Sequence, residues 1–254
     1  MNQARKVALV TGAARGIGEA TARRFLQDGY QVVGVDILDV ADTLSLEAAG
    51  AYELIQCDVS DEAAVGDLAK HVLSKYGRVD VLANIAGVVL VKPLTQTTWM
   101  EFQRIVNVNL GGIFLLLKYV LPVMQRQRRG VVVNMGSVSG HVGQVDHSLY
   151  GATKAAVIGL CRALAWEMAP YHVRINSISP GSVDTPMLRS DIEIESQASG
   201  KPFLEVRKIR EAEQALGRWA EPREIAAAVA FLASDEASFI TGADLLVDGG
   251  WVAR

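Results

Sequence analysis

The sequence predicts an α/β fold in which a doubly wound, seven-stranded parallel sheet is flanked by helices on both faces within a single domain. Three observations lead to this prediction. Short β-branched runs alternate with longer stretches that have the length and the Ala/Leu content of helices. The short runs are almost continuously apolar, as strands are when both of their faces are covered. The 254 residues are 50% hydrophobic and 21% charged, which is enough apolar surface for one core of this size.

Each of the short runs is expected to be a buried strand. Because helical stretches separate the runs, right-handed crossovers would make the strands parallel. The predicted strands are residues 6–10, 31–35, 52–57, 80–83, 131–135, 174–178 and 245–247.

The longer stretches between these strands are expected to be helices. Pro222 is typical of a first helical turn, and Gly29 and Gly77 are typical of residues at a helix end. The predicted helices are residues 17–27, 62–75, 99–124, 150–168 and 223–233.

Residues 188–217, between the sixth and seventh predicted strands, differ from the rest of the chain. The segment is rich in charge and contains Gly200 and Pro202, so few apolar contacts are expected to hold it down. Two interpretations remain open: a flap that covers a substrate, or a solvated surface insertion.

Composition excludes several classes of function. Lys and Arg number 25 against 28 Asp and Glu, and this net charge of −3 lacks the basic excess that binding a nucleic acid requires. The two cysteines, Cys57 and Cys161, lie far apart in apolar runs, which favours buried thiols in a reducing compartment. Residues 7–10 are too few for a signal-peptide core, and the apolar run 110–117 is too short to span a membrane. We therefore expect a soluble, cytoplasmic protein.

The first predicted strand runs directly into a glycine-rich turn, Thr-Gly-Ala-Ala-Arg-Gly-Ile-Gly, at residues 11–18. Gly12, Gly16 and Gly18 would let backbone N–H groups approach a pyrophosphate at the N-terminus of the helix that opens at Ile17, where the helix dipole favours an anion. Three glycines are also common in tight turns that bind nothing.

Asp36 strengthens the nucleotide interpretation. It follows the second predicted strand about 20 residues after Gly16, the separation at which a carboxylate reaches the hydroxyls of an adenosine ribose. A carboxylate there repels a 2′-phosphate, so NAD is favoured over NADP. Two alternatives remain: Asp36 could cap a helix or turn, and Arg15 could neutralise a 2′-phosphate, pair with Asp36 or bind the pyrophosphate.

Tyr150 and Lys154 stand at i and i+4, on one face of a predicted helix. An ammonium near a phenol favours the phenolate and would lower the pKa of the tyrosine toward neutrality, which makes the phenol a usable general acid and base. Such a pair also arises by chance as an amphipathic contact. Ser137, however, follows the fifth predicted strand at the carboxyl edge of the sheet, where α/β proteins bind ligands, and its hydroxyl could hold a substrate oxygen.

Further short motifs follow in order along the chain. They are Asp58-Val59, Asn84-Ile85-Ala86-Gly87, Asn107-Val108-Asn109-Leu110, Pro180-Gly181, Ile240-Thr241-Gly242 and Val247-Asp248-Gly249-Gly250. Together with the glycine turn, Ser137 and the Tyr150 and Lys154 pair, they resemble the classical short-chain dehydrogenase/reductase family over essentially the whole chain. The resemblance implies a Rossmann-type fold.

The resemblance also implies the catalytic roles. Tyr150 would exchange the proton, Ser137 would orient the carbonyl or alcohol, and Lys154 would bind the nicotinamide ribose while lowering the tyrosine pKa. Asn109 would complete a proton relay through water. Because these groups move only protons, a nicotinamide would supply the hydride.

The cofactor contacts implied by the resemblance are spread along the chain. One position departs from the family, since Ile85 replaces a usual asparagine, which affects a local hydrogen bond of the central sheet and leaves the chemistry unchanged. The expected contacts are Gly12, Arg15, Gly16, Ile17 and Gly18 in the turn, Asp36 at the ribose, Asp58 and Val59 at the adenine, Asn84, Ala86 and Gly87 in the ribose region, Tyr150, Lys154, Pro180 and Gly181, and Val183 and Thr185 at the carboxamide.

The leading hypothesis is an NAD-dependent oxidoreductase of secondary alcohols or ketones. A polyol, a sugar or a cyclic alcohol would suit the mixed polar and apolar residues near the site. The expected substrate contacts are Ser137, Gln144, His147, Tyr150 and Met187.

Two alternatives are weighed against it. An NADPH-dependent reductase of 3-oxoacyl thioesters would need a basic patch for an acidic carrier protein, and Arg126, Arg128 and Arg129 are candidates, although cations also suit a helix C-terminus. A non-catalytic nucleotide-sensing protein would be expected to lose part of the catalytic set, which is complete here.

No metal site is expected, because the four histidines show no ligand spacing such as His-Glu-x-x-His. The predicted helices 99–124 and 150–168 carry apolar residues over more of their surface than one sheet face can bury. With the family resemblance, this predicts a homotetramer of 222 symmetry. The histidines are His71, His141, His147 and His172.

Overall fold

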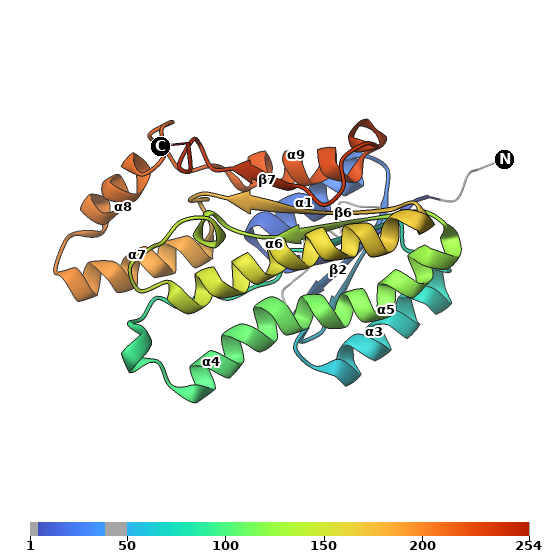
Figure 1. The fold of residues 1–254 in the computed structure, drawn as a ribbon, viewed down its shortest axis with the longest axis horizontal. Helices are drawn as coiled ribbons and strands as arrows, with labels where there is room; N and C mark the ends of the chain where they lie inside the picture. The colour runs from blue at the N-terminus through green and yellow to red at the C-terminus, as the bar shows by residue number, and fades with distance from the viewer. Residues whose placement is uncertain (1–4, 39–49, 254) are drawn as a thin grey trace.

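The structure is a computed structural model that describes residues 5–38 and 50–253, so residues 1–4, on which the signal-peptide prediction partly rests, lie outside it (Figure 1). Seven parallel strands form one sheet in the order β3-β2-β1-β4-β5-β6-β7. This confirms the predicted fold class. The strands are β1 (Val7–Thr11), β2 (Gln31–Asp36), β3 (Tyr52–Gln56), β4 (Val81–Asn84), β5 (Gly130–Met135), β6 (Val173–Pro180) and β7 (Asp244–Val247).

Helices cover both faces of the sheet, as Figure 1 shows. One face is covered by α3 (Glu62–Tyr76), α5 (Gly112–Gln127) and α6 (Ser148–Met168), and the other by α1 (Gly16–Gln27) and α9 (Pro222–Ala233). Successive β1 residues point to opposite faces, so Leu9 packs in the first layer and Val10 in the second. Two covered faces explain why the strands read as continuous apolar runs.

Strand order reverses between β1 and β4, because the chain adds β2 and β3 on one side of β1 and the remaining strands on the other. The loops that follow two strands on either side of such a reversal diverge and leave a crevice at the carboxyl edge of the sheet. The glycine turn after β1 and the Asn84-Ile85-Ala86-Gly87 segment after β4 both lie at this crevice.

Local signals account for several helix ends. Asp61 accepts hydrogen bonds from the backbone N–H groups of Ala63 and Ala64 at the start of α3, and Gly77 ends that helix in the left-handed region. Pro222 is the first residue of α9, as predicted. The bounds of these elements differ from the predicted ones by a few residues at most.

The predicted helix 99–124 is not one regular helix. The segment comprises α4 (Trp99–Val106), a π-helical turn (Asn107–Gly111) and α5. A π turn holds an extra residue, so it rotates every later side chain relative to the predicted face. By length and composition Trp99–Gln127 is also apolar enough to cross a membrane, unlike the run 110–117 alone. In the structure 44% of its most apolar window is buried, and Leu116, Leu117 and Met124 pack in the core.

Residues 188–217 contain two helices that the sequence analysis did not predict. We call the segment formed by α7 (Pro186–Ser199), α8 (Phe203–Ala212) and the chain up to Trp219 the helical cap. It projects from the sheet at the end where β6 finishes (orange in Figure 1). Ile192, Val206 and Trp219 form a small core of their own, against which Leu188 and Phe203 pack. Charged residues alternate with the apolar positions along both helices, and this obscured the helical pattern in the sequence.

Candidate active site

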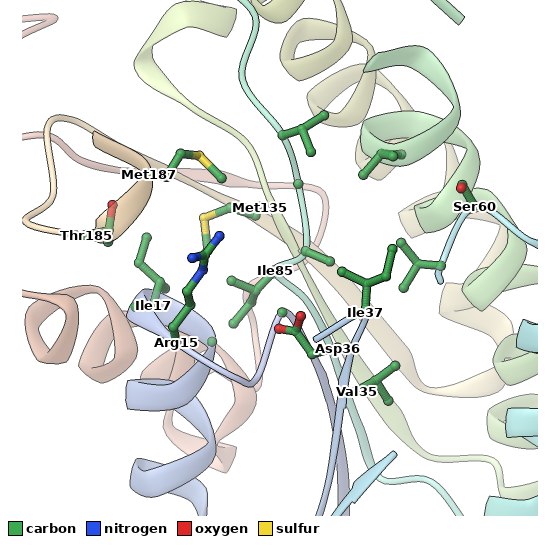
Figure 2. Close-up of a pocket in the computed structure, with 18 of the residues that line it drawn as sticks. Arg15, Ile17, Val35, Asp36, Ile37, Ser60, Ile85, Met135, Thr185 and Met187 are labelled. Atoms are coloured by element: carbon green, nitrogen blue, oxygen red, sulfur yellow. The ribbon is translucent and has the colours of Figure 1, made fainter. Parts of the chain in front are cut away.

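A cavity of about 580 Å³ opens at the carboxyl edge of the sheet (Figure 2). This volume lies within the range of small-molecule and cofactor sites. Most of the predicted site residues form its wall. They are Gly12, Arg15, Gly16, Ile17, Gly18, Asp36, Asp58, Val59, Ala86, Gly87, Ser137, Tyr150, Lys154, Pro180, Thr185 and Met187.

Other predicted site residues do not belong to the wall that the described residues form. Asn84 is buried and donates its amide N–H to Asn134 Oδ1 at 2.7 Å, which directs it into the sheet. Val183 is buried and pairs with Ala220 as an isolated bridge. The residues placed outside the wall are Asn84, Asn109, Gln144, His147, Gly181 and Val183.

The turn after β1 has the close backbone approach that its glycines predict. Gly12 and Gly16 have φ of +69° and +63°, in the left-handed region where a side chain is strained. A Cβ on Gly18 would overlap the carbonyl oxygen of Gly12. The turn can therefore fold this tightly only with glycine at these positions, and it brings the N-terminus of α1 to the cavity.

Asp36 ends β2 and serves as a turn cap while lining the cavity. Its Oδ2 accepts from the Ala14 N–H at 3.0 Å and its Oδ1 from the Leu38 N–H at 3.1 Å. A carboxylate has about four acceptor sites, so both oxygens can still accept from ribose hydroxyls. The cap and the ribose contact, set out above as alternatives, are compatible here.

Arg15 is exposed and makes no ion pair with Asp36 in the part of the chain that the structure describes. Figure 2 shows its guanidinium extending toward Met135, away from Asp36. The pairing alternative for these two residues is therefore not the one observed, and Arg15 remains available to an anion in the cavity.

The loop that carries Ile85 is joined to the end of β1 through its backbone. Thr11 Oγ1 accepts from the backbone N–H groups of Ile85 and Ala86 at 3.0 and 3.1 Å, which joins the ends of β1 and β4. Beneath them the Asn84 Oδ1 atom is buried without a hydrogen-bond partner. One hydrogen bond of the central sheet is thus unmade, and the Ile85 side chain lines the cavity.

Tyr150 and Lys154 meet the cavity from the first turns of α6. Lys154 is 3% exposed, its Nζ donates to the Met135 carbonyl at 2.8 Å, and it lies 5.6 Å from the centroid of the Tyr150 ring. Burial, which disfavours the charged form, lowers the pKa of Lys154 to about 8.

Burial also raises the pKa of Tyr150 to about 12, against the opposing effect of a hydrogen bond with Ser137 and with a further contribution from the Asp191 charge. The predicted lowering of this pKa toward neutrality is therefore wrong for the protein by itself. The ammonium of Lys154 is near the ring but donates to a backbone carbonyl, and desolvation of the phenolate is the largest effect on the pKa of Tyr150.

Asn109 stands behind the cavity wall, inside the π-helical turn. Its Oδ1 accepts from the Val88 N–H at 2.8 Å, and its amide donates to the Val88 carbonyl at 2.9 Å and to Thr153 Oγ1 at 3.2 Å. A Cβ at Gly87 would lie 3.2 Å from Asn109 Oδ1 and 3.6 Å from Lys154 Nζ. Asn109 therefore connects the loop after β4 with the catalytic face of α6.

The two predicted substrate residues outside the wall lie in the loop before α6. The His147 ring is 6.3 Å from that of Tyr150, edge to face, and its Nδ1 donates to the Val145 carbonyl at 2.7 Å. Gln144 Oε1 accepts from the Ser139 hydroxyl. His147 therefore packs against Tyr150, whereas Gln144 contacts the turn that follows Ser137.

Several cavity residues escaped the sequence analysis. Most follow the carboxyl ends of β2 to β5, and the rule that ligands bind at this edge could have found them. Others come from the π turn or its approach, which no helix pattern reveals. The missed residues are Val35, Ile37, Leu38, Cys57, Ser60, Ile85, Val88, Arg104, Asn107, Val108, Met135, Gly136 and Pro186.

Comparisons with known proteins agree with this geometry. A protein-family model described as enoyl-(acyl carrier protein) reductase matches residues 12–252. Cis-4-hydroxycyclohexanecarboxylate dehydrogenase of Sinomonas cyclohexanicum is 40% identical over 254 residues, covering 98% of each chain. The 3-oxoacyl-(acyl-carrier-protein) reductase FabG of Thermotoga maritima is 37% identical over 251 residues, covering 97% of this chain and 98% of that one.

A solved structure also resembles the chain over nearly its whole length. ElxO with NADP bound superposes with a TM-score of 0.89 at 31% identity, covering 98% of this chain and 100% of that chain. The relatives are named as dehydrogenases and reductases of CH–OH groups. The chain belongs to the classical short-chain dehydrogenase/reductase family and is an oxidoreductase that acts with a nicotinamide cofactor.

Proposed function

We propose that the protein is an NAD-dependent dehydrogenase of a secondary alcohol, acting on a polyol, a sugar or a cyclic alcohol. The observation that carries the proposal is that one cavity contains both Asp36 with the glycine turn and the set Ser137, Tyr150 and Lys154. The first group suits the adenosine half of a dinucleotide, and the second suits proton transfer at a carbonyl.

The cavity residues fit the cofactor chemically. The N-terminus of α1 and its glycines offer backbone N–H groups to a pyrophosphate, and Lys154 offers an ammonium to the nicotinamide ribose. The nicotinamide, when bound, supplies the hydride. Asp36 accepts two ribose hydroxyls and repels a 2′-phosphate, which favours NAD. Arg15 is the group that would favour NADP instead.

The chain itself handles the proton. With a pKa raised to about 12, Tyr150 holds its proton at neutral pH and can donate it to a carbonyl oxygen during reduction. Oxidation requires Tyr150 to accept the alcohol proton, so its pKa must fall as the active complex assembles. Ser137 orients the reacting oxygen, and Asn109 supports the proton path.

The decisive experiment measures kcat/KM with NAD and with NADP for secondary alcohols, sugars and hydroxyacyl thioesters, following the absorbance of the reduced nicotinamide. We expect the wild-type protein to have a higher kcat/KM with NAD than with NADP. Asp36→Ala should narrow or reverse this preference because it removes the repulsion of a 2′-phosphate and leaves Arg15 free.

Asp36→Asn is the matched control. It keeps an acceptor for the backbone N–H groups but loses the charge, so it separates the electrostatic role of Asp36 from its role as a turn cap. A wild-type preference for NADP, the cofactor bound in the ElxO structure, would contradict the Asp36 argument.

A second candidate, reduction of 3-oxoacyl thioesters, is favoured by the similarity to FabG. The proposed carrier patch is weaker than the sequence indicates, because Arg129 pairs with Asp235 at 3.0 Å. The patch precedes β5, whereas Ser137 follows it, so in one chain the two lie at opposite edges of the sheet. If carrier-linked thioesters are the best substrates and Arg128→Glu raises their KM alone, this candidate replaces the first.

We also propose the predicted homotetramer of 222 symmetry. Phe114 on α5 is 56% exposed, Trp166 on α6 is 86% exposed, and Phe239 before β7 is fully exposed. Large apolar side chains on these elements are typical of a surface that a second copy covers. Light scattering at micromolar concentration tests this: a mass of 27.3 kDa, that of one chain, would refute it.

Two further parts of the proposal concern the cap and the compartment. We propose that residues 188–217 act as a substrate flap, because Met187 at the start of α7 lines the cavity. A cytoplasmic location is supported by the two cysteines, Cys57 and Cys161, which are buried free thiols.

A further inference from the structure

A buried carboxylate joins three segments beside the active site. Asp244, at the start of β7, has a side chain only 5% exposed. Its Oδ1 accepts from the hydroxyls of Ser177 and Ser179 on β6 at 2.5 and 3.0 Å. Its Oδ2 lies 2.7 Å from His141 Nε2. Because a carboxylate only accepts, the imidazole must carry its hydrogen on Nε2.

His141 belongs to the turn that carries Ser137. The Gly140 N–H donates to the Ser137 carbonyl at 2.9 Å, and the N–H groups of His141 and Val142 donate to the Val138 carbonyl at 2.8 and 3.0 Å. These bonds make residues 137–142 one compact turn, so the position of His141 is transmitted to Ser137.

Asp244 supports the other end of the same turn. A Cβ at Gly136 would lie 2.5 Å from Ser179 Oγ and 3.4 Å from Asp244 Oδ1, so the residue before Ser137 rests directly on this network. The network thus contacts the turn immediately before Ser137 and again at His141.

The opposite side of the turn packs closely on the catalytic helix. A Cβ at Gly140 would lie 3.0 Å from the Ala155 nitrogen and 3.1 Å from the Lys154 carbonyl carbon. A Cβ at Gly151 would lie 2.6 Å from the Ser139 carbonyl oxygen. The turn is therefore held between Asp244 on one side and the Tyr150 and Lys154 face of α6 on the other.

We propose that His141 and Asp244 are a positioning pair for the reaction: their bond holds the Ser137 turn against α6 and so sets the Ser137 hydroxyl relative to Tyr150. Neither His141 nor Asp244 belongs to the cavity wall that the described residues form. The inference rests on the proposed function, in which Ser137 orients the reacting oxygen. The proposal gives a reason for burying a carboxylate at the start of β7, where the backbone pairing of β6 and β7 does not require one.

The first test compares two substitutions of His141. His141→Leu removes the donor while keeping an apolar body, and His141→Gln retains an N–H donor at a similar reach. We expect His141→Leu to lower kcat about tenfold with little change in the affinity for NAD, because a small misplacement of a catalytic group is costly. His141→Gln should recover kcat to within about twofold of wild type.

The matched control is His71→Leu. His71 also pairs with a carboxylate, Glu53, at 3.0 Å, but on α3 far from the cavity. This variant should leave kcat unchanged. An unchanged kcat in His141→Leu as well would overturn the proposal.

The second test asks whether His141 acts through Ser137. In a Ser137→Ala background, His141→Leu should change the residual kcat by less than about twofold, because the group that it positions is already gone. A full tenfold further loss would mean that His141 only stabilises the sheet or acts on α6, and the proposal would be wrong.

A third measurement does not depend on turnover. Amide hydrogen exchange across residues 136–142 should be faster in His141→Leu than in wild type, and unchanged in His141→Gln and His71→Leu. If the wild-type protein oxidises no alcohol, the proposed function fails, but this measurement still tests whether the His141 and Asp244 bond holds the Ser137 turn in place. Equal exchange in all four proteins would show that the bond does not hold the turn.

Discussion

Two regions contribute to the proposed substrate site, and they are held in place in different ways. The proposed catalytic floor consists of Asn109 in the π-helical turn, Ser137 after β5, and Tyr150 and Lys154 on α6. Asn109 and Lys154 are 0% and 3% exposed, and both bond to backbone carbonyls. The helical cap depends on a small core of its own and on ion pairs such as Arg210 with Glu195 at 2.8 Å.

The difference corresponds to two proposed tasks, proton transfer by the floor and choice of substrate by the cap. Groups that transfer protons need fixed distances, and the floor obtains them from packing shared with the main core. A region that must admit and release a substrate has to open at a low cost in free energy. Exposed ion pairs and a small separate core stabilise the cap only weakly, so they permit such opening. Substitutions in the floor should therefore change kcat, and substitutions in the cap should change KM.

The largest effect is expected at the floor. Tyr150→Phe should lower turnover by a factor of roughly 10² or more, because only the proton-transferring hydroxyl is removed. Cofactor affinity, measured by fluorescence or calorimetric titration, should stay close to that of the wild type. Wild-type turnover in this variant would show that another group is the acid and base.

The next largest effect concerns stability. Because burial lowers the pKa of Lys154 to about 8 from 10.5, its charged form costs free energy in the folded protein at pH 7. In the absence of cofactor, Lys154→Met should therefore raise the free energy of unfolding by about 2 kcal/mol. This figure is net of the lost hydrogen bond to the Met135 carbonyl.

This gain should depend on pH with a defined sign. Between pH 8 and 10.5 the folded wild-type protein releases the Lys154 proton before the unfolded chain does, so its stability rises with pH and the advantage of Lys154→Met shrinks. Denaturant titrations at pH 7 and 10 check this. Lys70→Met, at an exposed ion pair, is the control that should change little. A constant advantage across this range would contradict the assignment.

A matched pair of core substitutions tests the independence of the cap. Val157 in the main core and Val206 in the cap core are both fully buried. Val157→Ala should lower the global free energy of unfolding by about 1–2 kcal/mol. Val206→Ala should instead speed amide exchange in α7 and α8 and raise KM, with a smaller global effect. Equal global losses would show that cap and floor unfold as one unit.

The smallest expected effect is a change in proteolysis. Lys208, in the middle of α8, has no ion pair among the described residues, whereas its neighbours Arg207 and Arg210 are paired with Glu211 and Glu195. Trypsin cleavage in the cap should slow several-fold when NAD and substrate are both present, because closure holds the helices down. Equal rates with and without ligands would identify the cap as a surface insertion.

Much of the site could be read from the sequence because its residues sit at the ends of strands. Gly12, Asp36 and Ser137 each follow an apolar run, and the carboxyl ends of parallel strands share one edge. The residues that could not be read, such as Arg104 and Val108, reach the cavity from an irregular helix whose phase is set by tertiary contacts. The same irregular turn placed Asn109 behind the wall.

By itself the sequence determined the strands, their parallel arrangement and the pairing of a glycine turn with a Tyr150 and Lys154 face, because periodicity and turn chemistry are local properties. Only the tertiary structure decided the π turn, the two cap helices and the rise in the pKa of Tyr150. It also decided the bond between His141 and Asp244. Each of these depends on burial among residues distant in the chain, and desolvation and packing are set by the assembled core rather than by sequence neighbours.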